Sequence, residues 1–175
     1  MALTHRLATR DDLPLLTPLV DASIDELQKD YLSEEQIRSG RAIMGLDTQL
    51  IDDGTYFVIE IDGEVAGCGG WSRRATMYGG DHSGGRDAAL LDPAQDPARV
   101  RAMYTHPEFV RRGVGRLILS LCEAAAAAEG FSTVELVATE AGLPLYTSAG
   151  FVATERLEIP VDDVLIPATR MIKSI

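Results

Sequence analysis

The spacing of apolar residues changes in the middle of the chain from that of a strand to that of a helix. Val100–Thr105 can run extended, and Pro107 ends this stretch because proline has no N–H to donate. From Val114 onward, apolar residues recur at the three- and four-residue spacing of one helical face, and the alanine run Ala124–Ala128 favours a helix. Gly130 can close that helix in the left-handed conformation. The pattern predicts a strand, a glycine turn and a long helix.

Upstream of this unit, the pattern predicts a strand, two helices and a β-hairpin. In chain order they are a strand at His5–Ala8, a helix capped by Thr9 with an apolar stripe at Leu16, Val20, Ile24 and Leu27, a helix from the capping box Ser33–Gln36 to near Gly45, and strands at Thr55–Ile61 and Glu64–Ser72 around an Asp-Gly turn. We expect Trp71 in the core.

Downstream, the pattern predicts one strand, a short helix and a closing pair of strands. In chain order they are a strand at Thr133–Ala138, a helix that carries Tyr146, and strands at Val152–Ile159 and Ala168–Lys173, with Pro160 and Pro167 bracketing the connection. The segment Ser72–Ala98 is polar and glycine-rich, which predicts a long loop.

Composition indicates one soluble globular domain over residues 1–175, with 46% hydrophobic and 25% charged residues. The formal charge of −11 argues against nucleic acid and anionic membranes as partners. The chain has neither a membrane-length apolar run nor the apolar core of a signal peptide, and we expect a cytoplasmic protein. Cys68 and Cys122 are expected to be buried free thiols, and no Cys/His cluster has metal-ligand spacing, so no metal is predicted.

The glycine turn has the chemistry of an anion site. Gly113 and Gly115 lack a β-carbon, and the first turn of the helix leaves backbone N–H groups unpaired. Five of the 16 basic residues fall between Arg99 and Arg116, which places a positive island in an acidic chain. A phosphate ligand is favoured over a plain turn with solvated arginines. Ile118 occupies the third glycine position of a dinucleotide fingerprint, and no Gly-Lys-Ser or Gly-Lys-Thr follows, so both of those motifs are excluded.

The segment Val110–Gly115 resembles the acetyl-CoA-binding motif of the GNAT superfamily of N-acetyltransferases, Gln/Arg-x-x-Gly-x-Gly/Ala, and departs from it at Val110. Leu143–Phe151 is similar to the helix-end signature of that family, Leu-Tyr-x-x-x-Gly-Phe. The resemblance implies an α/β (α+β) fold with a mixed, mostly antiparallel sheet of about seven strands, helices on both faces, and the order β-α-α-β-β-β-α-β-α-β-β. It also implies that the fourth and fifth strands run parallel and splay apart, so that pantetheine enters the gap.

The resemblance implies an acetyltransferase in which an amine attacks acetyl-CoA directly in a ternary complex. The acceptor would be a primary amine of a small molecule or peptide, and Tyr146 would be the general acid toward the leaving thiolate. The cofactor-binding residues would be Met103, Tyr104 and Thr105 on the strand, and Val110, Arg111, Arg112, Gly113, Val114, Gly115 and Arg116 at the turn.

The general base is left open. Some family members place a glutamate at the start of the fourth strand, where this chain has Arg99. The remaining candidates are His82, Asp81, Asp87 and Glu60, alongside a base acting through water or an acceptor that binds already neutral. We take His82 as the candidate base. We expect its loop, Ser72–Ala98, to contribute to the acceptor site and not to the cofactor site; the alternative is a mobile surface loop.

Two other functions stay open: acetylation of protein N-termini or lysines, and a catalytically silent CoA-binding regulatory module. A homodimer is also left open.

Overall fold

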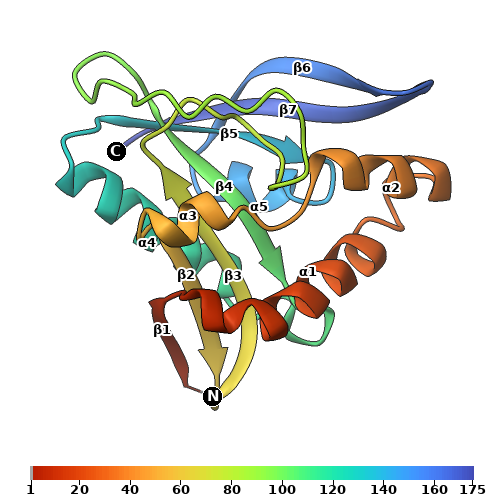
Figure 1. The fold of residues 1–175 in the computed structure, drawn as a ribbon, viewed down its shortest axis with the longest axis horizontal. Helices are drawn as coiled ribbons and strands as arrows, with labels where there is room; N and C mark the ends of the chain where they lie inside the picture. The colour runs from red at the N-terminus through yellow and green to blue at the C-terminus, as the bar shows by residue number, and fades with distance from the viewer. Residues whose placement is uncertain (1) are drawn as a thin grey trace.

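The computed structural model describes residues 2–175, in which seven strands form one mixed sheet (Figure 1). The sheet order is β1-β2-β3-β4-β5-β7-β6, and all neighbours are antiparallel except β4 and β5. In chain order the strands are β1 (Leu3–Leu7), β2 (Tyr56–Ile61), β3 (Glu64–Ser72), β4 (Ala98–Thr105), β5 (Thr133–Thr139), β6 (Val152–Val161) and β7 (Val164–Ser174). The predicted mixed, mostly antiparallel sheet is confirmed.

Helices cover both faces of this sheet (Figure 1). On one face, α1 packs against the sheet through Leu16 and α3 packs through Leu50. On the other face, α4 packs through Ile118. In chain order the helices are α1 (Leu13–Leu27), α2 (Glu34–Gly40), α3 (Thr48–Asp52), α4 (Val114–Ala128) and α5 (Leu143–Ser148). The predicted order of elements is confirmed, with α3 as an addition. No helix among residues 2–175 combines the length and apolar character needed to cross a membrane.

Alternating residues of the central strands point into two hydrophobic cores, one on each face of the sheet. On β2, Val58 points to the α1 side and Ile59 to the α4 side, and both are fully buried. Trp71 is 1% exposed and its ring meets Phe131 edge to face at 6.0 Å, which confirms its predicted core position. The two cysteines are free and buried, as predicted.

The parallel contact between β4 and β5 is short. Only Ala98 with Val134 and Arg99 with Glu135 are in register, after which the two strands diverge. In Figure 1, β4 runs down toward α1 while β5 continues alongside β7. This divergence opens the sheet at its centre.

The predicted boundaries of the closing strands were wrong. Pro160 and Pro167 lie inside β6 and β7, which continue to a turn at Asp162–Asp163. Both prolines are tolerated because each lies where its strand has no neighbour on one side. Pro160 is on β6, the edge strand of the sheet. Pro167 lies just beyond the end of β5, whose last residue, Thr139, pairs with Ala168.

The second predicted helix also ends earlier than expected. It stops at Gly40 and tightens into a 3-10 turn at Arg41–Ile43. The chain then forms α3, which sequence reasoning missed, with the Asp47 carboxylate accepting a hydrogen bond from the Gln49 N–H at 3.0 Å. A five-residue helix is too short to show a periodic apolar pattern, so its cap is its main local signal.

Candidate active site

A cavity of about 950 Å³ occupies the region where β4 and β5 diverge. One part, here called the turn side, is formed by the turn at residues 110–116, the end of β5 and α5. The other part, here called the apolar side, is formed by the end of α1, residues 40–44, residues 77–79 and the β6–β7 hairpin. The middle of β4 also lines the cavity, through residues 100–105.

The turn side holds the N-terminus of α4. Gly113 is the N-cap residue with φ +86°, a left-handed conformation that glycine adopts without strain. Arg111 adopts φ +59°, which is uncommon for a residue with a side chain. Val114, Gly115 and Arg116 line the cavity, so the unpaired N–H groups of the first helical turn open toward it. The turn therefore has the geometry of an anion site.

Gly115 has a packing role as well. A β-carbon there would lie 2.6 Å from the Leu145 Cδ2 atom, so the glycine lets α5 pack against the first turn of α4. The two motifs found in the sequence are thus in contact.

The arginines of the turn have different surroundings. Arg111 and Arg116 line the cavity, and Arg116 Nη2 donates to the Ser148 hydroxyl at 3.1 Å. Arg112 is outside the lining, with its guanidinium 5.4 Å from the centre of the Phe109 ring. The positive charge that faces the cavity at the turn comes from Arg111 and Arg116.

The predicted positive island is smaller than the sequence suggested. Arg99 is buried in ion pairing with Glu135, which also accepts from Arg170. The buried Arg101 pairs with Asp47 at 2.9 Å. Acidic residues distant in sequence compensate both charges, so neither adds a free cation to the turn.

A β-bulge interrupts β4 at the middle of the cavity. Cys68 pairs with Tyr104 and Gly70 pairs with Arg101, so two β4 residues, Ala102 and Met103, oppose the single residue Gly69. Ala102 has φ +50°, and neither bulged residue has a register partner on β3 or β5. Both line the cavity, so the bulge offers backbone groups to a ligand.

Tyr146 lies against this bulge. Its hydroxyl is 3.8 Å from the Met103 sulfur, and its ring meets Phe151 edge to face at 6.0 Å. Burial raises the pKa of the Tyr146 phenol above its ordinary value, so the group stays protonated and can donate a proton in the cavity.

The remaining predicted strand residues, Tyr104 and Thr105, also line the cavity. The Tyr104 hydroxyl accepts a hydrogen bond from the Gly45 N–H at 2.8 Å, and burial raises the pKa of this phenol to about 12. Its side chain thus ties β4 to the segment before α3.

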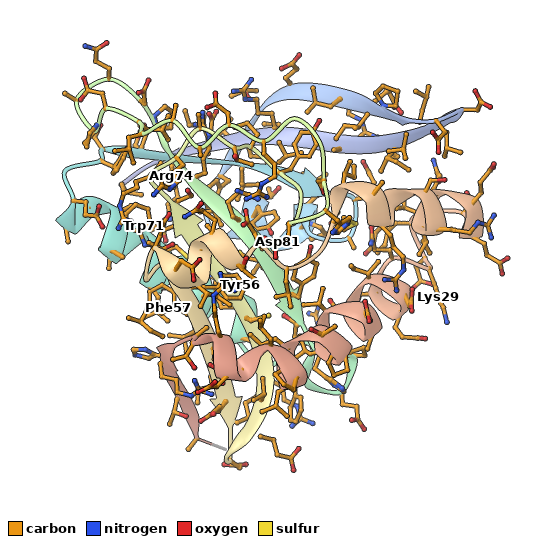
Figure 2. The ribbon with its side chains drawn as sticks, viewed as in Figure 1. Lys29, Tyr56, Phe57, Trp71, Arg74 and Asp81 are labelled. Carbon is orange, nitrogen blue, oxygen red and sulfur yellow. The ribbon has the colours of Figure 1, made fainter. Side chains whose placement is uncertain are left out.

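The long loop is held in place by hydrogen bonds and ion pairs. The buried Asp47 carboxylate binds Arg86 at 2.8 Å and Arg101 at 2.9 Å, and Arg101 also donates to the Gly79 carbonyl at 2.6 Å. Asp81, labelled in Figure 2, accepts from the Thr48 N–H at the start of α3 at 2.9 Å. The loop is therefore docked against α3 and β4.

His82 takes part in this docking. Its Nε2 atom lies 2.7 Å from the Arg41 carbonyl oxygen, and it is outside the cavity lining that includes Tyr146. The structure does not bring these two predicted catalytic residues together.

Sequence reasoning missed the side chains that make the apolar side. Met77 and Tyr78 come from the loop, and Ile159 and Ile166 come from the hairpin between β6 and β7. An adjacent Met-Tyr pair inside a polar, glycine-rich stretch was a local signal for the first two. The isoleucines gave none, since they match any strand pattern.

The model of the acetyltransferase (GNAT) domain family matches residues 52–153. No curated protein matches the chain. Among solved structures, a GCN5-related N-acetyltransferase from Rhodopseudomonas palustris is 21% identical, with a TM-score of 0.72 and coverage of 100% of this chain and 99% of that one.

Two further solved structures contain a coenzyme. The PaiA N-acetyltransferase of Thermoplasma acidophilum, in complex with coenzyme A, is 14% identical with a TM-score of 0.68, and each chain is covered completely. The putative acetyltransferase YncA of Salmonella typhimurium, solved with acetyl-CoA, is 19% identical with a TM-score of 0.64, covering 99% of this chain and 94% of that one. At these identities the likeness shows the fold.

Proposed function

Because this chain belongs to the GNAT acetyltransferase family and is an acyltransferase, we propose that it transfers the acetyl group of acetyl-CoA to a primary amine of a small molecule or peptide. The observation that carries this proposal is the meeting of three features in one cavity: the N-terminus of α4, the bulge at Ala102–Met103 and the phenol of Tyr146. They match the three needs of the reaction: an anion site for phosphate, backbone groups for the acyl chain and a proton donor.

The turn side would hold the coenzyme. The N–H groups at Val114–Arg116 and the guanidinium groups of Arg111 and Arg116 would bind its phosphates. The unpaired backbone at Met103 would bind the pantetheine and polarise the acetyl carbonyl.

Tyr146 would supply the proton of the leaving group. The amine nitrogen forms a bond to the acetyl carbon, the carbon–sulfur bond breaks, and Tyr146 donates its proton to the departing thiolate before taking one back from solvent. Burial raises the pKa of this phenol, so the proton is present across the physiological pH range, although the same shift makes the group a weaker acid.

For the amine, we propose an acceptor that binds already neutral and releases its proton to solvent after the attack. His82 lies outside the cavity lining, and Asp30, the only carboxylate lining the cavity within residues 2–175, is exposed. This choice is one of those the sequence left open.

The apolar side would hold the acceptor. Its wall includes Leu27, Met77, Ile159 and Ile166, which favour an apolar group beside the amine.

The proposal predicts that acetyl-CoA stabilises the folded chain. A ligand bound only by the folded state at about 100 times its Kd adds about 2.7 kcal/mol, which corresponds to about 5–10 °C in Tm for a chain of this size. Thermal unfolding with and without acetyl-CoA, together with calorimetric titration, measures this. Absence of both a shift and binding heat would contradict the proposed function.

Neutralising the turn should weaken coenzyme binding. The double variant Arg111→Gln, Arg116→Gln removes two exposed cations that line the cavity, and we expect a Kd for CoA about 3- to 30-fold higher, with a weaker salt dependence. The control Lys29→Gln, Arg38→Gln removes the same net charge from exposed residues outside the lining. Equal increases in the Kd for CoA in the two double variants would show that binding depends only on the net charge of the chain.

Tyr146→Phe should lower kcat about 10- to 1000-fold with a smaller change in KM for acetyl-CoA, since the proton transfer acts in the transition state. Thiol release with the best amine from a panel measures both constants. Because the donor's pKa is raised, we expect the wild-type rate to show no loss on the alkaline side up to pH 9. An unchanged kcat would leave Tyr146 with a packing role.

Loosening the docked loop should affect the acceptor alone. Arg86→Gln breaks the contacts with Asp47 and the Gly80 carbonyl, and we expect KM for the amine to rise several-fold while the Kd of acetyl-CoA stays within about twofold. Arg74→Gln is the matched control, because Arg74 also binds one aspartate, Asp53, and one loop carbonyl, but lies outside the cavity lining (Figure 2). Parallel losses for both substrates would rule out a specific acceptor role.

A further inference from the structure

The carbonyl of Ala102 is bound by a side chain from two strands away. The hydroxyl of Tyr56, on β2, donates to it at 2.6 Å, although β3 lies between the two strands. Tyr56 is 1% exposed and is labelled on β2 in Figure 2. A contact of this kind is not part of a regular sheet.

The path of the Tyr56 ring is opened by a glycine. Gly70 is the register partner of Tyr56, and a β-carbon there would lie 2.9 Å from the Tyr56 Cδ1 atom. With no side chain at Gly70, the ring can cross β3 and reach the bulge. A β-carbon at Gly70 would also collide with the Thr55 carbonyl oxygen, so this glycine allows the close approach of the β2 backbone as well as the passage of the Tyr56 ring.

The bulge needs this bond for two reasons. Ala102 has φ +50°, a conformation that residues with a β-carbon rarely adopt. Ala102 also has no register partner on β3, so the regular strand pairing is interrupted at this residue. The phenol supplies a replacement partner while the residue keeps its left-handed conformation.

We propose that Tyr56 is a positioning residue that holds the Ala102–Met103 bulge in the shape that presents the Met103 backbone to the acetyl group. This inference rests on the proposed function. Tyr56 is outside the cavity lining, so we infer that it acts through Ala102 and not by contact with either substrate. Sequence motifs do not reveal such a residue, because its role depends on a contact across 46 positions.

The test compares acetyl-CoA with CoA, which differ only in the acetyl group. Tyr56→Phe keeps the ring and removes the hydroxyl; we expect the Kd of acetyl-CoA to rise about 5- to 10-fold and that of CoA to stay within about twofold, as measured by calorimetry. With the best amine of the panel, kcat should fall about 10-fold, and KM for acetyl-CoA should change by a smaller factor than kcat.

Thr55→Val is the matched control. Thr55 is 1% exposed, and its hydroxyl donates to the Leu50 carbonyl at 3.2 Å, so the variant also loses one buried hydroxyl-to-carbonyl bond, but away from the bulge. We expect both Kd values to change equally there. An equal change of both in Tyr56→Phe, or a selective loss in Thr55→Val, would overturn the proposal.

A rescue variant separates positioning from general stability. Glycine adopts φ +50° freely, so adding Ala102→Gly to Tyr56→Phe should restore at least half of the lost preference for acetyl-CoA. Failure of the rescue would also count against the proposal, even if Tyr56→Phe proved hard to fold. Failure of the wild-type chain to bind CoA would instead refute the proposed function itself.

Discussion

The parting of β4 from β5 is the constraint on which the rest of the structure depends. Two parallel strands of this length could pair along most of their course, but only two residue pairs are in register. Past that point the backbone of β4 has no partner on β5, and buried N–H and C=O groups are costly unless other groups form hydrogen bonds with them. The cavity, the bulge and the helix N-terminus all meet in this gap.

Ion pairs stabilise the edges of the gap. Glu135 sits on the last register pair of β5 and binds both Arg99 and Arg170, which links β4, β5 and β7 where the strands separate. On the other side, Asp47 binds Arg86 and Arg101 and so joins the loop to β4. Removing the one acid of either cluster would leave a buried arginine without its acidic partner, Arg99 in the first and Arg101 in the second, which is strongly destabilising.

The sequence predicted what local patterns control. The strand, turn and helix around Gly113 were readable because proline, glycine and apolar spacing act over a few residues, and the Asp-Gly hairpin turn for the same reason. The buried ion pair of Arg101 could not be predicted, because its partner Asp47 is 54 positions away in the sequence. His82 likewise looked like a base from its polar surroundings, and only the folded chain shows its nitrogen beside the Arg41 carbonyl.

The glycines of β3 have a consequence for the spacing between layers. A β-carbon at Gly67 would collide with Val114 at the start of α4, and one at Gly69 would lie 2.8 Å from Ile118 one turn later. Because β3 has no side chains at these two positions facing α4, the helix approaches the sheet more closely than larger residues would permit. The distance between the N-terminus of α4 and the bulge therefore depends on β3, a strand outside the cavity lining, and larger residues on β3 would move the helix away from the bulge.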